Sequence, residues 1–112
     1  MKTFFEMDVV QVGDLIIDPR RFSLLRNGNP ITLTKTEFKI LYLLMSKNGY
    51  VFSRQQITQH VWGAYILNFP RTIDVHICNI KRKVGKIGDK DVITVLKGVG
   101  YKLNNISGSV LI

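Results

Sequence analysis

The chain has 112 residues, 46% of them hydrophobic, and it carries 16 Lys and Arg residues against 8 Asp and Glu residues. This length allows one buried core, while no apolar run approaches the ~20 residues of a membrane-spanning helix and no secretory signal opens the chain. A single cysteine, Cys78, excludes an internal disulfide and a cysteine metal cluster. We therefore expect one compact cytoplasmic domain that packing alone stabilises.

Positive charge is concentrated toward the C-terminal end. Residues 1–32 have a net charge of zero, residues 33–62 of +3 and residues 63–112 of +5. This asymmetry favours an anionic partner, and nucleic acid above all. The alternative is a basic surface that serves only solubility.

The first third of the chain alternates short apolar runs with turn residues. The apolar runs lie at residues 9–12, 15–17, 22–25 and 31–33. Asn27-Gly28, between two of these runs, is a strong signal for a β-hairpin. The pattern predicts a meander of about four short antiparallel strands, which serves as scaffold.

At Thr34 the hydrophobic period changes from that of a strand to that of a helix. Thr34-Lys35-Thr36-Glu37 has the capping-box pattern, and apolar residues follow at helical spacing to about Lys47. Ser53-Arg54-Gln55-Gln56 is a second capping box, which opens a shorter helix that ends at Gly63. Two helices are therefore expected before the more basic part of the chain.

Residues 70–84 predict a third helix with two unlike faces. At about 100° per residue, Ile73, Ile77, Ile80 and Val84 form a narrow apolar stripe. The opposite side carries cationic, hydrogen-bonding and small apolar groups, namely Arg71, Thr72, Val75, Cys78, Asn79 and Arg82. Such groups reach phosphates, base edges and the thymine methyl in the DNA major groove, which admits one α-helix. The pattern is typical of a recognition helix.

A β-hairpin is expected after this helix. Following a Gly/Lys/Asp loop at residues 85–91, a β-branched run at 92–96 and a second run at 101–103 flank the turn Lys97-Gly98-Val99-Gly100. No helix follows these glycines, so they fit a turn and not a nucleotide-binding loop. The predicted domain spans residues 9–104, with 1–8 as an N-terminal tail or linker remnant and 105–112 as a C-terminal tail.

From Leu33 onward the order of motifs resembles the OmpR/PhoB-type winged helix-turn-helix, the DNA-binding effector domain of many bacterial response regulators. The segments that carry the resemblance are 33–41 with 51–54 and 61–63, then 71–77, then 95–103. The resemblance implies an α+β fold with an N-terminal four-stranded antiparallel sheet and three helices. It also implies that the third helix enters the major groove and that a C-terminal β-hairpin wing points toward the minor groove.

The resemblance implies contacts from the third helix to bases or backbone, from its C-terminal cations to phosphates, and from the wing. The residues concerned are Arg71, Thr72, Val75, His76 and Asn79, then Lys81, Arg82 and Lys83, then Lys97 and Tyr101. Thr36 and Arg54, near two helix N-termini, are expected to help hold the phosphate backbone. Trp62 is expected either in the core or with its indole N–H at a phosphate. A half-buried structural role is the alternative for His76.

Two positions depart from the family pattern. Many relatives carry arginine at one or both of the positions that Cys78 and Asn79 fill here, and arginine is the usual bidentate reader of guanine. Asparagine is better suited to adenine N6 and N7. We therefore predict a target site richer in A·T pairs than is usual for the family.

The sequence offers no paired carboxylates, catalytic triad or cofactor loop, so neither an enzyme activity nor a cofactor is expected. His76 and Cys78 point about 200° apart around a helix and cannot share a metal ion. The predicted function is sequence-specific binding of double-stranded DNA for transcriptional regulation. A winged-helix module that binds RNA or an acidic protein is the alternative.

The resemblance also carries implications for the intact regulator. It implies a receiver domain, which these residues do not contain, so we expect the chain to be the effector part of a longer protein. It further implies a homodimer, arranged head-to-tail or symmetrically, on repeated half-sites about one helical turn apart. In activating members, residues equivalent to 63–70 contact RNA polymerase. The apolar character of this loop here agrees either with a protein partner or with packing of part of the loop under the domain.

Overall fold

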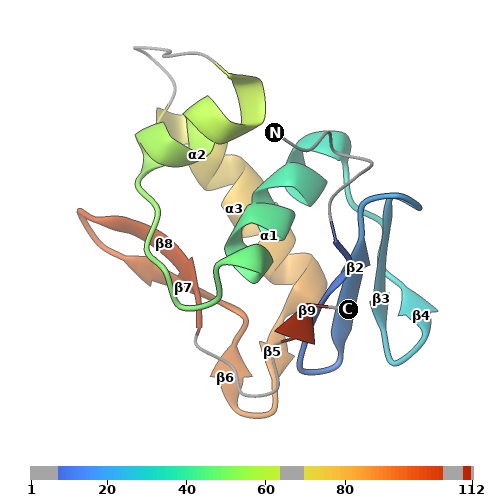
Figure 1. Ribbon diagram of the computed structural model, residues 1–112. Helices are drawn as coiled ribbons and strands as arrows, with labels where there is room; N and C mark the ends of the chain where they lie inside the picture. The colour runs from blue at the N-terminus through green and yellow to red at the C-terminus, as the bar shows by residue number, and fades with distance from the viewer. Residues whose placement is uncertain (1–7, 64–69, 105–109, 112) are drawn as a thin grey trace.

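The computed structural model describes residues 8–63, 70–104 and 110–111 of the chain. An N-terminal antiparallel sheet and a C-terminal hairpin lie on opposite sides of three helices (Figure 1). Four strands of this sheet come first in the sequence and the helices follow, and two hairpins and the last strand of the sheet come after the third helix. This is the winged helix-turn-helix arrangement that the sequence predicts.

The N-terminal sheet contains the predicted meander and one additional strand. β1 (Val10–Val12), β2 (Leu15–Asp18), β3 (Ser23–Arg26) and β4 (Asn29–Pro30) pair antiparallel in sequence order. β9 (Val110–Leu111) pairs with the other edge of β1. The expected C-terminal tail, residues 105–112, therefore contributes two residues to the sheet. This pairing satisfies backbone groups that the edge of β1 would otherwise expose.

The turn between β3 and β4 determines where the fourth strand begins. Asn27 and Gly28 have φ values of 50° and 81°, as a two-residue type I′ hairpin turn requires. Pairing resumes at Asn29, so the fourth strand is Asn29–Pro30 and not the expected run at residues 31–33. The strand position in the sequence analysis was therefore wrong by two residues, because the turn is as short as a hairpin allows.

The three helices are α1 (Lys35–Ser46), α2 (Arg54–Trp62) and α3 (Pro70–Val84). Both predicted capping boxes are present, since Thr34 and Ser53 each exchange hydrogen bonds with the residue three positions later. Gly63 ends α2 with a φ of 70°, a left-handed conformation that favours glycine. No helix among the described residues is long and apolar enough to cross a membrane.

The core lies where α3 crosses the other elements. The predicted apolar stripe of α3 is buried: Ile73, Ile80 and Val84 are 0% exposed and Ile77 is 2% exposed. This stripe joins one cluster with apolar residues of the sheet, of α1 and of the wing. Full burial of each such side chain stabilises the fold by about 1.5–3 kcal/mol. The stripe therefore holds α3 in place and leaves its opposite side for other contacts.

Two hairpins follow α3. The segment 85–91, expected as a loop, forms a short hairpin of β5 (Lys86–Ile87) and β6 (Lys90–Asp91) around a Gly88-Asp89 turn. Lys86 lies opposite Asp91 in this hairpin, and opposite charges facing each other favour the pairing. The wing consists of β7 (Ile93–Leu96) and β8 (Gly100–Leu103), as predicted.

Candidate nucleic-acid interface

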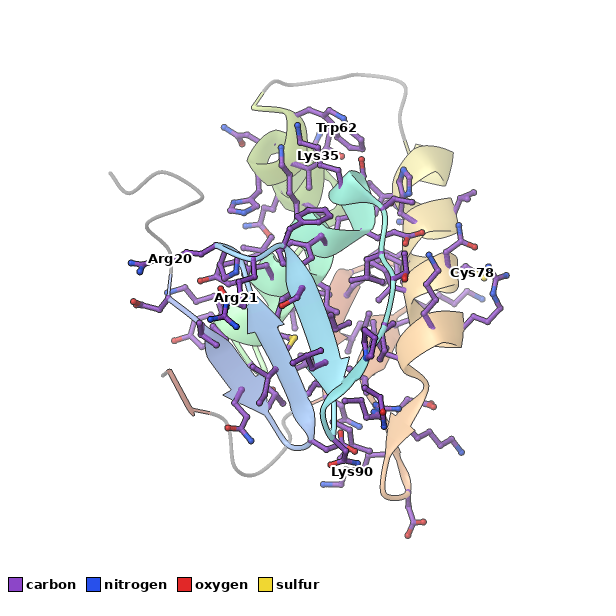
Figure 2. The ribbon with its side chains drawn as sticks, turned by 90° about the vertical axis from the view of Figure 1, so that its right-hand side faces the viewer. Arg20, Arg21, Lys35, Trp62, Cys78 and Lys90 are labelled. Atoms are coloured by element: carbon purple, nitrogen blue, oxygen red, sulfur yellow. The ribbon has the colours of Figure 1, made fainter. Side chains whose placement is uncertain are left out.

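The side of α3 opposite the core is open. Val75 is 57% exposed, and Cys78 and Arg82 are exposed, while Asn79 and Lys81 are half-buried. Figure 2 shows Cys78 on the side of α3 that faces away from the rest of the fold. The buried stripe and the open face that the sequence predicts are thereby confirmed for residues 73–84, and the outer face combines apolar, amide and cationic groups.

Two of these outward residues are linked to each other. Arg82 Nη2 donates a hydrogen bond to Asn79 Oδ1 over 3.1 Å. An amide oxygen has two lone pairs, so Asn79 keeps one acceptor position as well as both N–H donors. The link orders two flexible side chains before any partner binds, which reduces the entropy lost on association.

The N-terminal turn of α3 includes Arg71 and Thr72, two of the predicted contacts. Their side chains lie outside the described residues, as do residues 64–69 of the loop to which the resemblance assigns RNA polymerase contacts. The backbone of residues 70–72 is helical, so both positions belong to the same helix as Val75 and Asn79.

Trp62 lies at the end of α2 and next to α3. It is 40% exposed, so the core position that was one of its two expected roles is wrong, and its indole remains accessible. The ring centroids of Trp62 and His76 are 6.3 Å apart with a tilt of 46°. His76 is half-buried, and its Nδ1 has no hydrogen-bond partner among the described residues. Thr36 is half-buried in the first turn of α1.

Lys83 differs from the other cations of α3. Its Nζ lies 2.6 Å from Oε1 of Glu37, a residue that is 2% exposed and also closes the capping box of α1. Burial alone would raise the pKa of Glu37, but the Lys83 ammonium and the Thr34 N–H outweigh it and lower the pKa. Lys83, for which a phosphate contact was expected, instead forms an ion pair with Glu37 within the protein. A buried carboxylate requires such a partner.

Arg54 and Tyr101 meet at an acidic residue of α3. Arg54 Nε donates to Asp74 Oδ1 over 2.8 Å and Arg54 Nη2 to Asp74 Oδ2 over 3.2 Å. The Tyr101 hydroxyl also donates to Asp74 Oδ1. The Arg54 Cζ lies 5.7 Å from the centre of the Tyr101 ring, within cation–π range. We call this group the Asp74 junction.

The Asp74 junction changes the expected roles of two residues. Tyr101 is 3% exposed, so its side chain is not placed to contact DNA directly. Arg54 is 39% exposed but its guanidinium is bound in a bidentate pair. The sequence analysis did not identify Asp74 as a site residue. Its one sequence signal is that it is an acidic residue in an otherwise basic helix. No local pattern indicates its partners Arg54 and Tyr101, which lie 20 and 27 positions away.

The wing tip carries a cation beside apolar groups. Lys97 is exposed in the turn, Val99 is 61% exposed, and Val95 on β7 is 48% exposed. Gly98 has a φ of 77°, which a side chain would strain. The exposed tip is therefore suited to a surface contact, as the sequence predicts for Lys97.

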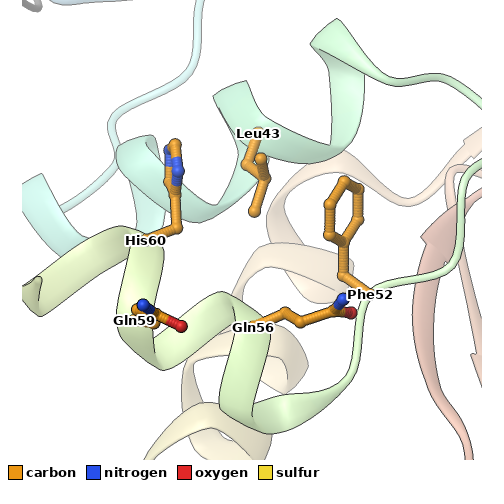
Figure 3. A pocket seen from close by; sticks show the side chains of 5 residues that line it. All are labelled: Leu43, Phe52, Gln56, Gln59 and His60. Atoms are coloured by element: carbon orange, nitrogen blue, oxygen red, sulfur yellow. The ribbon is translucent and has the colours of Figure 1, made fainter. Parts of the chain in front are cut away.

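A shallow pocket of about 320 Å³ lies between α1 and α2. Figure 3 shows its lining side chains, which are Leu43, Phe52, Gln56, Gln59 and His60. Partial burial, with a smaller contribution from the charge of Lys39, lowers the pKa of His60. The pocket contains none of the predicted DNA contacts, which leaves it outside the candidate interface.

Comparison with known proteins gives a consistent result. A family model described as "Transcriptional regulatory protein, C terminal" matches residues 28–103. The phosphate regulon transcriptional regulatory protein PhoB of Klebsiella pneumoniae is 30% identical over 97 residues, which are 87% of this chain and 42% of PhoB. The chain thus spans less than half the length of this relative.

Solved structures extend the comparison to three dimensions. The DNA-binding domain of CpxR from E. coli superposes with a TM-score of 0.81 at 33% identity, covering 90% of this chain and 100% of that one. The DNA-binding domain of AdeR, solved in complex with an intercistronic region, gives a TM-score of 0.71 at 28% identity and covers 82% of this chain and 95% of that one.

Proposed function

This chain belongs to the OmpR/PhoB-type family of winged-helix DNA-binding domains of response regulators, and from that premise we propose how it binds. In the proposal, α3 enters the major groove of double-stranded DNA, and the β7–β8 wing lies toward the minor groove. The observation that carries the proposal is the division of α3 into a buried stripe and an open face, which carries the exposed Arg82 and the half-buried Lys81. DNA binding and transcription regulation are properties of the family.

The contacts divide by chemistry. Base-edge contacts are assigned to the open face of α3, and phosphate contacts to cations on its flank and at the wing tip. The proposed base-contacting residues are Arg71, Thr72, Val75 and Asn79, and the proposed phosphate-contacting residues are Lys81, Arg82 and Lys97, with Thr36, Trp62 and His76 at the flank. Because Asn79 suits adenine, an A·T-rich target is part of the proposal. No direct DNA contact is assigned to Lys83, Arg54 and Tyr101. They position α3 and the wing through their contacts with Glu37 and Asp74.

For the intact protein we propose a cytoplasmic transcription regulator that binds repeated half-sites as a homodimer. Half-sites about one helical turn apart would place two α3 helices on the same side of the duplex. Residues 63–70 are the proposed contact with RNA polymerase, which rests on the family resemblance and on the apolar sequence of that loop.

A direct test is to select duplexes from a random pool with the wild-type chain and to measure affinity by fluorescence anisotropy. The selected duplex, a scrambled duplex and a single-stranded RNA of the same length are compared at two salt concentrations. We expect the selected duplex to bind at least about 10³-fold more tightly than the scrambled one, the usual specificity of such domains. Equal affinities, or preference for RNA, would contradict the proposal and favour an electrostatic interaction module.

A further inference from the structure

We propose that Asp74, although it belongs to the recognition helix, is a positioning residue that couples the wing to α3, so that both bind DNA as one rigid unit. The inference rests on the proposed function and adds a determinant of affinity that touches no nucleotide. It concerns the Asp74 junction and its effect on Lys97 at the wing tip.

The first step concerns why an acidic residue is found here. Asp74 is the one acidic residue between Glu37 and Asp89, and it lies on the helix that approaches a polyanion. An unpaired carboxylate there would repel phosphates. The bidentate pair with Arg54 neutralises it, at 2.8 and 3.2 Å, and the Tyr101 hydroxyl occupies a further acceptor position. The carboxylate is thus used within the protein and not toward DNA.

The second step concerns how β8 is attached. Phe52, just before α2, and Tyr101 exchange two backbone hydrogen bonds, of 2.8 and 2.9 Å. This approach requires Gly100, because a Cβ there would lie 2.1 Å from the Phe52 carbonyl oxygen. The buried side chains of Ile93, Tyr101 and Leu103 anchor the base of the wing in the core, and the backbone bridge holds β8 at Tyr101. The bond from the Tyr101 hydroxyl to Asp74 adds a polar attachment to α3 itself.

The polar attachment at Asp74 sets the direction of the wing relative to α3. Tyr101 pairs with Val95 across the hairpin, and Gly100 pairs with Leu96 directly before the turn that holds Lys97. A rotation at Tyr101 is therefore transmitted to the tip, where it displaces the Lys97 ammonium from its phosphate. Holding the wing in its binding orientation reduces the ordering that association must supply.

The test is a double-mutant cycle read from the salt dependence of binding to the selected duplex. In the wild-type chain, Lys97→Ala should reduce the magnitude of the log-log salt slope by roughly 0.9, the value for one phosphate contact. In the Asp74→Ala chain, which removes both acceptor oxygens, the same substitution should change the slope by less than about a third of that, because the wing tip no longer reaches its phosphate. Tyr101→Phe, which keeps the ring and the backbone bridge but removes the hydroxyl that donates to Asp74, should give a comparable loss.

Ile17→Val is the matched control. It lowers stability from the buried face of β2, where Ile17 is 0% exposed, without touching the wing, so Lys97→Ala should retain its full effect in that chain. If Lys97→Ala changes the slope equally in the wild-type and Asp74→Ala chains, the coupling is refuted while DNA binding stands. If Asp74→Ala does not fold, the Tyr101→Phe chain provides the same comparison. A wild-type chain with no preference for duplex DNA would instead overturn the proposed function itself.

Discussion

The two long sides of α3 carry neighbouring cations that have different tasks. On the inner side, Lys83 lies 2.6 Å from a carboxylate that is 2% exposed. On the outer side, Arg82 is exposed and bound only to the amide of Asn79 among the described residues. Adjacent residues of equal charge thus belong to the fold in one case and to the proposed interface in the other.

The difference shows that the surroundings of the partner decide what a cation does. A carboxylate shielded from water interacts strongly with a charge that reaches it, and leaving it unpaired is costly. Water screens the contacts of an exposed arginine with its neighbours, so little free energy is lost when the side chain moves to contact a phosphate. Positions that hold α3 in place are thereby distinguished from positions that are proposed to bind DNA, and the following substitutions test that distinction.

The largest effect is expected from Lys83→Met. It leaves Glu37 buried without its cation, and should lower the free energy of unfolding by about 3 kcal/mol in urea titrations. The matched variant Arg82→Met should change it by less than about 0.5 kcal/mol, as exposed positions usually do. Adding Glu37→Gln to Lys83→Met should restore part of the loss. Equal effects of the two methionine variants would erase the distinction between the sides of α3.

Asn79→Arg tests whether the outer side of α3 contacts base edges. Arginine at this position offers two donors to guanine O6 and N7, so selected duplexes should gain a G·C pair at one position of each half-site. The discrimination should be about 1–3 kcal/mol, typical of one bidentate contact. Selection with the wild-type and variant chains, followed by sequencing, measures it. An unchanged preferred sequence would show that Asn79 does not contact a base.

Arg82→Ala and Lys83→Ala compare the two sides in DNA binding. Loss of Arg82 should reduce the magnitude of the salt slope by roughly 0.9, as expected for one phosphate contact. Loss of Lys83 should leave the slope nearly unchanged, when both variants are measured under conditions where they are folded. Anisotropy titrations at four salt concentrations provide the slopes, and the reverse order of effects would contradict the assignment.

The smallest effect concerns pH. Because the pKa of Glu37 is lowered in the folded protein, its ionised form contributes stability that is present above the ordinary carboxyl pKa. That contribution is lost as the pH falls through the folded-state pKa. The wild-type chain should therefore lose more stability than Glu37→Gln between pH 7 and pH 3. Parallel pH dependence in the two chains would show that Lys83 does not stabilise the carboxylate.

Much of the fold follows from local patterns in the sequence. The capping boxes at Thr34 and Ser53 and the stripe of α3 were all predicted, because each depends on residues that follow one another at intervals of three or four positions. The β5–β6 hairpin was missed because each strand has two residues and no apolar alternation. The pairing of β9 with β1 joins opposite ends of the chain, which no local pattern can indicate.

The open face of α3 could be predicted for the same reason, because helical geometry separates it from the buried stripe. The roles of Lys83, Arg54 and Tyr101 could not. Lys83 is paired with a residue 46 positions away, and Arg54 with one 20 positions away. Sequence reasoning treated each as a free charge or ring, since only the packed helices bring the partners together.

Amide chemical-shift mapping with the selected duplex tests the central claim most directly. If the open side of α3 and the wing tip bind together, the amides of residues 75–82 and 97–99 should shift strongly. Those of the N-terminal sheet, residues 10–30, should remain close to their free positions. Shifts concentrated around the α1–α2 pocket, at Leu43 and residues 52–60, with α3 and the wing unaffected, would contradict the account.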